Sequence, residues 1–255
     1  MEAEFAALAE EVAREAGAQL REEFAGARPT ISTKSTPTDL VSIADTRAEE
    51  LIRARLSTAR PSDAILGEEG GDSTGTSGVQ WIVDPLDGTT NFLFGLPQWA
   101  VSIAAHMGEE PLAGVVYDPM RDECWSATRN GPALLDGEVV RGSQRSELAT
   151  ALVSTGFGYD ADVRSLQAQG LARLLPRVRD IRRFGSAALD LAWTAAGRYD
   201  AYYERGVQVW DIAAGALICE RAGLAIRRLE PAPPAGAGIL VAPPALIDAI
   251  QTLID

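Results

Sequence analysis

Apolar positions near the start of the chain follow the spacing of a long amphipathic helix. An apolar side chain recurs every three or four residues, at Phe5, Leu8, Val12, Ala16, Leu20 and Phe24. Such a stripe predicts one face of a helix that covers a core. Residues 27–39 lack this period and are rich in Ser, Thr and Pro, which favours a loop or a short ribbon. A second helix is expected after Ser42, because Asp45 follows it at capping-box spacing, with Asp in place of Glu.

Short apolar runs predict the strands of the first half of the chain, which we place at about residues 1–147. The runs at 64–71 and 79–84 are expected to be buried strands whose ends deliver Glu68 and Asp84. The polar segment 71–78 between them is predicted to be a mobile loop. From 99 to 140 the apolar runs and the Asp136-Gly137 turn indicate antiparallel hairpins. The first half therefore predicts helices packed on a largely antiparallel sheet, an α+β arrangement.

The second half, about residues 148–255, alternates strand and helix and is predicted to be α/β layered. Residues 230–238 are Pro- and Gly-rich, and we interpret them as a loop between strands rather than as a domain linker. The whole chain, 1–255, is thus expected to be one domain. The predicted strands lie at 151–157, 180–184, 200–204 and 238–244, and the predicted helices at about 162–176, 186–196 and 211–223.

Composition and charge narrow the class of protein. No stretch of about 18 apolar residues could span a bilayer, and the acidic N-terminal helix lacks the basic and apolar regions of a secretory signal, so a cytoplasmic protein without membrane partners is expected. With 36 acidic and 23 basic side chains, the net charge is −13, which opposes nonspecific binding to nucleic acid. An anionic substrate would need local help, such as metal ions. Cys124 and Cys219 lie in separate predicted elements and are expected to be buried free thiols.

The stretch DPLDGTTNF, at 84–92, concentrates the candidate chemistry. Asp84 and Asp87 are three residues apart, and two carboxylates held this close repel unless they are protonated or bridged by a cation. Oxygen ligands without His or Cys indicate Mg²⁺ or a similar hard ion, with Mn²⁺ as an alternative. Gly88, Thr89 and Thr90 then offer backbone amides at a predicted helix start, which suits phosphate oxygens. An isolated stretch of this kind is also compatible with a capped turn or a calcium-like loop.

Three further acids stand at the edges of predicted elements, and each has a simple structural reading. Glu68 fits a solvated loop acid, Asp45 a charge at a helix N-terminus, and Asp211 an N-cap. His106, the only histidine, lies in a predicted strand and is interpreted as structural. The chain has no GxSxG elbow, Walker A motif or GxGxxG run, which argues against a serine hydrolase or a nucleotide-binding fold.

The order of five segments resembles the inositol monophosphatase family of Mg²⁺-dependent, lithium-sensitive sugar phosphatases. The segments are DLVSIAD (39–45), GEE (67–69), DPLDGTTNF (84–92), RRFGSAALDL (182–191) and YYERGVQVWDIAAG (202–215). The resemblance spans nearly the whole chain, and several stretches are similar to bacterial inositol-1-phosphatases. It implies a layered αβαβα sandwich, a homodimer, and hydrolysis of a small phosphorylated polyol such as myo-inositol-1-phosphate.

The resemblance also implies a role for individual residues. Glu68, Asp84 and the carbonyl of Leu86 would bind one Mg²⁺, and Asp84, Asp87 and Asp211 a second, with Glu68 touching a third. In such sites the ions lie roughly 4 Å apart, where they activate water and neutralise the leaving oxygen. Asp45 and Thr89, with Glu68, would orient and deprotonate the attacking water. The amides of Gly88 and Thr89 would hold the phosphate.

Substrate selection is assigned by the resemblance to Gly185, Ser186, Ala187, Glu204 and Gln208. Some relatives have histidine at the position of Gln208, so that contact stays open. The plainer alternative makes Ser186 only an N-cap and Glu204 a strand-end acid. Arg182 and Arg183 could bind a second phosphate, lie at a subunit contact or be solvated, and Lys34 could approach the metals or be solvated.

Two other functions stay open. The substrate could be fructose-1,6-bisphosphate, histidinol phosphate or adenosine 3′,5′-bisphosphate. Alternatively, the chain could be a regulatory, RNA-associated protein on the same scaffold, although the complete set of acids argues against loss of chemistry.

Overall fold

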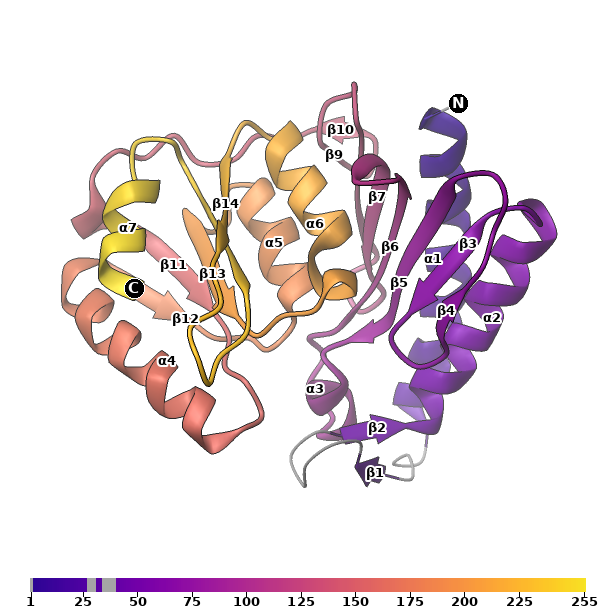
Figure 1. The fold of residues 1–255 in the computed structure, drawn as a ribbon, viewed down its shortest axis with the longest axis horizontal. Helices are drawn as coiled ribbons and strands as arrows, with labels where there is room; N and C mark the ends of the chain where they lie inside the picture. Colours follow the sequence, from indigo (N-terminus) through magenta and orange to yellow (C-terminus); the bar gives the residue numbers. More distant parts are fainter. Residues whose placement is uncertain (1, 27–30, 34–39) are drawn as a thin grey trace.

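Two long helices cover the outer face of the larger sheet. The computed structural model describes residues 2–26, 31–33 and 40–255, and α1 (Glu2–Ala25) and α2 (Ile43–Ala59) pack side by side on this face (Figure 1). The predicted stripe of α1 is confirmed, since Phe5, Val12 and Leu20 are buried against the sheet. Helix α2 begins one residue after Ser42, as its spacing predicts.

The larger sheet has eight strands in the order β10-β9-β8-β7-β6-β5-β3-β4. All neighbouring pairs are antiparallel except β3 with β5, which confirms a largely antiparallel first half. A separate antiparallel ribbon joins β1 (Ile31–Thr33) to β2 (Leu40–Ser42). A loop or a short ribbon was expected over 27–39, and the second strand of the ribbon lies just beyond that range. Lys34 lies outside the described residues. The strands of the large sheet are β3 (Ala64–Gly67), β4 (Gly71–Ser73), β5 (Val79–Asp87), β6 (Ala100–Met107), β7 (Glu110–Asp118), β8 (Glu123–Thr128), β9 (Leu134–Leu135) and β10 (Glu138–Val139).

Two predictions for this half are wrong in detail. Part of the expected loop 71–78 is the edge strand β4, whose Ser73 hydroxyl bonds to the backbone of Ile65. Strand β5 does not end at Asp84 but continues to Asp87, with a shift of register against β6 between these two aspartates. Pro85 lies inside that shift and has no N–H to give to the ladder, which explains why the pairing is interrupted there.

Two helices fill the space between the large sheet and a second sheet. These are α5 (Ala187–Ala195) and α6 (Val209–Arg221), whose apolar faces join strands of both sheets in one buried cluster. Helix α6 approaches β7 very closely, because a Cβ on Gly114 would lie 2.8 Å from the Cα of Ala214.

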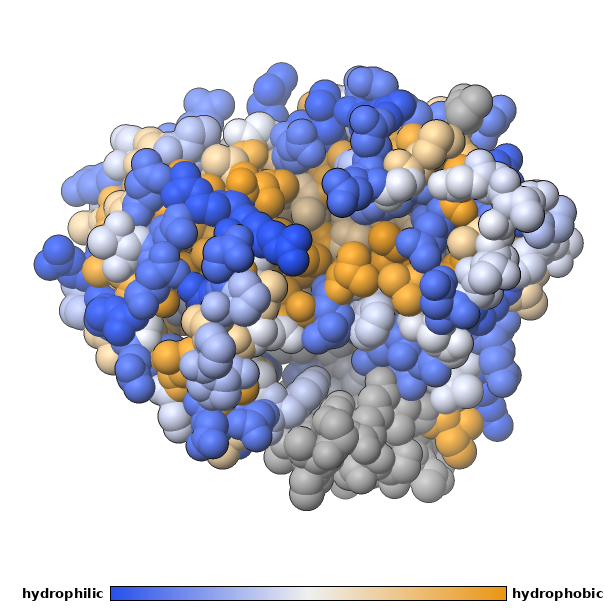
Figure 2. Space-filling view, viewed as in Figure 1, coloured by the Kyte–Doolittle hydropathy of each residue, from blue (hydrophilic) through white to orange (hydrophobic). Residues whose placement is uncertain are grey.

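Hydrophilic residues cover most of the face seen in Figure 2, and hydrophobic residues gather at its centre.

The second sheet has five strands in the order β12-β11-β13-β15-β14, and two further helices cover its outer face. The resulting α, β, α, β, α succession confirms the predicted layered sandwich (Figure 1). The sequence patterns did not indicate β14 or α7. The elements are β11 (Leu152–Thr155), β12 (Asp180–Arg182), β13 (Ala201–Arg205), β14 (Ala225–Leu229), β15 (Gly238–Ala242), α4 (Ala161–Leu174) and α7 (Ile247–Ile254), with 3-10 turns at Leu148–Thr150 and Leu175–Arg177.

Side chains outside the cavity region agree with the plain readings. Cys124 and Cys219 are buried free thiols. His106 lies on β6, where burial lowers its pKa. In the part of the chain that the structure describes, no helix combines the length and apolar character needed to cross a bilayer.

Candidate active site

A cavity of about 350 Å³ opens between the two halves of the molecule. The large sheet contributes one wall, and the second sheet with α5 and α6 contributes the other. Most of the predicted site residues line it, although they come from distant parts of the chain: Glu68, Asp84, Leu86, Asp87, Gly88, Thr89, Gly185, Ala187, Glu204, Gln208 and Asp211. Asp45 and Ser186 are absent from this lining and lie behind it.

The DPLDG segment forms the floor on the side of the large sheet. Asp84 is only 2% exposed, and its Oδ1 accepts the N–H of Leu86 at 3.0 Å. Gly88 has a φ of +97°, and a Cβ there would lie 2.9 Å from the carbonyl oxygen of Gln98, so only glycine fits. The short helix α3 (Thr89–Leu93) starts immediately after it, which confirms the predicted helix start.

Thr89 and Asp45 are brought together from positions 44 residues apart. The Thr89 hydroxyl donates to Oδ1 of Asp45 at 2.8 Å, and it also lies 3.1 Å from the carbonyl of Leu86. Asp45 is completely buried in the first turn of α2. The hydroxyl of Thr89 thus connects the cavity with a buried carboxylate behind it, which is the arrangement that a proton relay requires.

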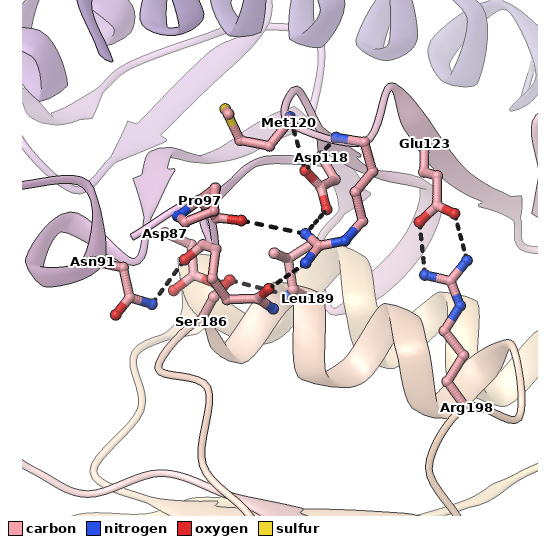
Figure 3. A network of polar contacts seen from close by, with 11 residues as sticks. Asp87, Asn91, Pro97, Asp118, Met120, Glu123, Ser186, Leu189 and Arg198 are labelled. Carbon is pink, nitrogen blue, oxygen red and sulfur yellow. Dashed lines mark hydrogen bonds and ion pairs between the residues drawn. The ribbon is translucent and has the colours of Figure 1, made fainter. Parts of the chain in front are cut away.

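Asp87 and Ser186 meet across the seam between the two halves (Figure 3). Oδ2 of Asp87 accepts the Ser186 hydroxyl at 2.5 Å and the N–H of Ala188 at 2.7 Å, at the start of α5. Ser186 also caps α5 by accepting the N–H of Leu189. The resemblance implied that backbone groups at the start of this helix contact the substrate, and the hydroxyl of Ser186 is engaged with Asp87 and with the helix. Its N-cap role is confirmed.

Asp211 lies in the first turn of α6, three residues after the N-cap. The N-cap is Gln208, whose backbone N–H donates to Oδ2 of Asp211 at 2.7 Å. The interpretation of Asp211 as the N-cap itself is therefore wrong, because the helix starts one turn earlier than expected. Both side chains line the cavity.

The acids that line the cavity disfavour one another's charged forms. Burial raises the pKa of Asp84 well above its usual value, and the charges of Glu68, Asp87 and Asp211 raise it further. Burial raises the pKa of Asp87 to about 6, against the hydrogen bonds from Ser186 and Ala188. Burial and the charge of Asp87 raise the pKa of Asp211 as well. A bound cation would relieve this repulsion.

The donor set fits a hard divalent ion. It consists of four carboxylates and the carbonyl of Leu86, the oxygen ligands that Mg²⁺ prefers. Among the described residues, no three acidic, histidine or cysteine side chains are already drawn together around one ion position. The fit therefore rests on the chemistry of the donors and on their mutual repulsion.

Glu204 stands on the opposite wall, at the end of β13. Its Oε2 accepts the hydroxyl of the fully buried Tyr202 at 2.9 Å. Burial raises the pKa of Glu204 to about 7, although Tyr202 and Arg183 act in the opposite direction. Gly156 lies directly against this carboxylate, because a Cβ at that position would overlap it. The carboxylate is thus confined from two sides.

Arg182 and Arg183 are adjacent in the sequence but have different surroundings in the structure, and the sequence did not indicate this difference. Arg183 lines the cavity, and the central carbon of its guanidinium lies 5.9 Å from the centre of the Phe157 ring. Arg182 instead forms an ion pair with Asp180 at 2.6 Å on the surface. The segment Phe157, Gly158 and Tyr159 also lines the cavity and was not predicted as part of the site. Its only sequence signal is a Gly- and aromatic-rich run directly after a strand.

Comparisons with known proteins place this geometry in a family. The family model described as the inositol monophosphatase family matches residues 1–250. The chain belongs to the inositol monophosphatase family. It is 47% identical over 235 residues to the inositol-1-monophosphatase SuhB of Mycobacterium tuberculosis, covering 88% of this chain and 81% of that protein. This confirms the resemblance seen in the five sequence segments.

Solved structures of family members have the same fold. The crystal structure of the extragenic suppressor protein suhB from Bartonella henselae superposes with a TM-score of 0.90 at 35% identity, covering 97% of each chain. A relative in Salmonella typhimurium, 39% identical over 218 residues, covering 85% of this chain and 82% of its own, is named Nus factor SuhB. The family assignment makes this chain a phosphatase on the inositol monophosphatase scaffold, in a family that is generally Mg²⁺-dependent.

Proposed function

We propose that this protein hydrolyses myo-inositol-1-phosphate to myo-inositol and inorganic phosphate. The observation that carries the proposal is the meeting of Glu68, the Asp84–Asp87 pair and Asp211 on one cavity, beside the helix start at Gly88 and Thr89. The M. tuberculosis relative, named inositol-1-monophosphatase, supports the substrate.

The residues proposed to hold Mg²⁺ are Glu68, Asp84, Asp87 and Asp211 with the carbonyl of Leu86. Two or three Mg²⁺ ions, or Mn²⁺, would supply a lowered pKa for water and neutralisation of the charge that develops on the departing oxygen. These roles leave the chain's other groups to bind the phosphate, to take the proton and to hold the polyol.

Thr89 and Asp45 are proposed to take the proton from the attacking water. Because the Thr89 hydroxyl already donates to Asp45, its oxygen can accept a proton from the water while its own proton passes to the Asp45 carboxylate. The water oxygen then forms the new bond to phosphorus and the ester bond to the polyol oxygen breaks. That oxygen takes up a proton from solvent water to give the free polyol, and Asp45 returns its proton to solvent. Water attacks directly, so no covalent enzyme intermediate is required, and the amides of Gly88 and Thr89 hold the phosphate oxygens.

The polyol is proposed to rest against the second wall. Glu204 would accept hydrogen bonds from ring hydroxyls, and the start of α5 at Gly185 and Ala187, with Gln208, would frame the ring. For Ser186 we propose an indirect role through Asp87. The two halves, about 1–147 and 148–255, are proposed to work as one domain, since each contributes only one of the two cavity walls.

A substrate panel tests the proposal. Phosphate release from myo-inositol-1-phosphate, fructose-1,6-bisphosphate, histidinol phosphate and adenosine 3′,5′-bisphosphate would be measured with and without Mg²⁺. The inositol ester is expected to have the highest kcat/KM, and all release is expected to need the metal. A much higher kcat/KM for another ester would show that the proposed substrate is wrong. Hydrolysis that persists in excess chelator would show that the proposed metal mechanism is wrong.

A second candidate function is a regulatory, RNA-associated role on the same scaffold, since the Salmonella relative is named as a factor, Nus factor SuhB, rather than as a phosphatase. The net charge of −13 opposes it. A salt-dependent shift with RNA that persists in Asp84→Asn, a variant expected to hydrolyse nothing, would favour this function alongside hydrolysis. No shift at low salt would rule it out.

A homodimer is proposed as the oligomeric state. Phe94 and Leu96 are 69% and 52% exposed, and Phe184 is 39% exposed. The segment of Phe94 and Leu96 lies next to Phe184, because Asn91, just before that segment, donates its side-chain N–H to the carbonyl of Phe184. Large apolar side chains that gather on a surface are typical of subunit contacts. Light scattering on the purified protein would distinguish a dimer from a monomer, and a Phe94→Ser, Leu96→Ser variant is expected to be monomeric.

A further inference from the structure

The inward face of α2 has three charged residues at four-residue spacing. Asp45, Glu49 and Arg53 succeed one another along one side of the helix. Asp45 contacts Thr89, as described above, whereas Glu49 is used by no step of the proposed reaction. Its side chain is nevertheless 2% exposed, and carboxylates are seldom buried to this extent unless they are fully paired.

Glu49 is paired mainly with the turn that carries Glu68. Its Oε2 accepts the N–H of Glu69 at 2.7 Å, and its Oε1 accepts the N–H of Gly70 at 2.7 Å. Oε1 also accepts Nε of Arg53 at 2.6 Å. Hydrogen bonds to an ionised acceptor are short and strong. The two backbone amides directly after Glu68 are thus fixed by one carboxylate.

The turn is also shaped around this carboxylate. A Cβ on Gly67 would overlap the Glu49 carboxyl group, and one on Gly70 would lie 2.7 Å from Oε1. Arg53 adds a hydrogen bond to the carbonyl of Gly71. The backbone on both sides of Glu68 therefore rests against Glu49 and Arg53.

We propose that Glu49, held by Arg53, is a positioning residue that sets where Glu68 enters the cavity. Because Asp45 lies one turn earlier on the same helix, α2 fixes the Glu68 turn and the Thr89–Asp45 pair in one register. The inference rests on the proposed function in one respect, the assignment of Glu68 as a metal ligand. It predicts that loss of the Glu49 charge weakens metal binding although Glu49 touches no metal.

Glu49→Gln tests this inference, since it preserves the shape of the side chain and removes its charge. Mn²⁺ binding to the protein without substrate would be measured by calorimetry and electron paramagnetic resonance. Loss of an outer residue that orients a ligand commonly weakens metal binding by about 10- to 100-fold, and we expect a decrease of that size. The Mg²⁺ concentration for half activation should rise by a similar factor, while kcat at saturating Mg²⁺ changes by less than about threefold. The amides of Glu69 and Gly70 should also exchange their hydrogens faster.

Asp63→Asn is the matched control. Asp63 is another buried carboxylate paired with an arginine, Arg60, at 2.9 Å, and it lies just beyond the far end of α2. Both variants lose a buried charge, but only Glu49→Gln should weaken Mn²⁺ binding. Equal weakening in both, or none in Glu49→Gln, would overturn the inference. If circular dichroism finds Glu49→Gln unfolded, Arg53→Gln, which removes the ion pair that holds Glu49 and the hydrogen bond to the carbonyl of Gly71, is judged by the same criteria.

Glu68→Gln and Asp84→Asn separate the two levels of the argument. If both weaken Mn²⁺ binding and Glu49→Gln does not, the positioning role is wrong and the metal assignment stands. If neither weakens it, the metal assignment is wrong, and the positioning role falls with it.

Discussion

The two walls of the cavity are built differently. On the first wall, Asp84 is buried, Gly88 has no space for another residue, and Thr89 is bonded to a buried acid. On the second wall, Gln208 and Arg183 are exposed, and Glu204 is only partly buried although Tyr202 and Gly156 confine its carboxylate. Tightly constrained groups suit chemistry that is the same for every phosphate ester, and looser ones suit a leaving group that differs between substrates. Substitutions in the first wall, and at the proposed metal ligand Asp211, should therefore reduce all activities together, whereas those at the other residues of the second wall should change their order.

The largest expected effect is at the centre of the first wall. Asp84→Asn should decrease kcat/KM by about a thousandfold or more for every ester in the panel, because metal assistance contributes several kcal/mol to the barrier. Initial rates of phosphate release at saturating Mg²⁺ measure this effect. Retention of activity toward one ester alone would mean that the first wall is not common to all substrates.

The next effect concerns the proton path. Thr89→Ala should decrease kcat by about 100-fold or more, in the range usual for loss of a proton-transfer group, with little change in KM. Thr89→Ser keeps the hydroxyl that donates to Asp45 and should restore most of the activity. If the serine variant is as slow as the alanine variant, then Thr89 acts through packing and the proton takes another route.

The third effect concerns stability, and it depends on the buried carboxylate of Glu204 in the second wall. The pKa of Glu204 is raised to about 7, chiefly by burial, so its neutral form stabilises the fold below about pH 4.5, and this contribution is lost as the pH rises through 7. Glu204→Gln should lack that loss. In chelator-treated protein, its advantage in free energy of unfolding over the parent should grow between pH 4.5 and 7, by up to about 3 kcal/mol. Urea unfolding at several pH values measures it, with Glu138→Gln, a substitution of an exposed glutamate, as the control.

The smallest effect is the most selective one. Gly156→Ala would push the Glu204 carboxylate from its position, which should decrease kcat/KM for myo-inositol-1-phosphate by about tenfold. Hydrolysis of p-nitrophenyl phosphate, whose leaving group has no ring hydroxyls, should change little. Parallel assays of the two esters decide the matter. An equal decrease for both would show that the second wall also serves the chemistry.

Local sequence patterns predicted most of the first wall and less of the second. DPLDGTTNF is contiguous, so its aspartates, its glycine and its helix start could be recognised together. Strand β4 was missed because its residues, Gly71–Ser73, are small and polar and pair through the backbone at a sheet edge. The orientation of Ser186 and the difference between Arg182 and Arg183 depend on contacts between distant elements. Local spacing contains no information about such contacts.

Glu49 is a further case in which sequence and structure differ in meaning. A glutamate four residues before an arginine on a helix is typical of a solvated pair, and nothing in its neighbourhood marks it as buried. Only the return of residues 67–71 over the helix encloses it. Burial by a remote segment turned an ordinary helical pair into a structural element of the site.

The bond from Asp87 to the start of α5 also has an implication for redesign of this enzyme. Asp87 belongs to a strand of the large sheet, its carboxylate bonds to the start of α5, and it lines the cavity. A substitution there is therefore expected to change both the packing of the layers and the rate of turnover. New substrate preferences are better sought in the segment 157–159 and at Gln208, which line the cavity on the side of the second wall.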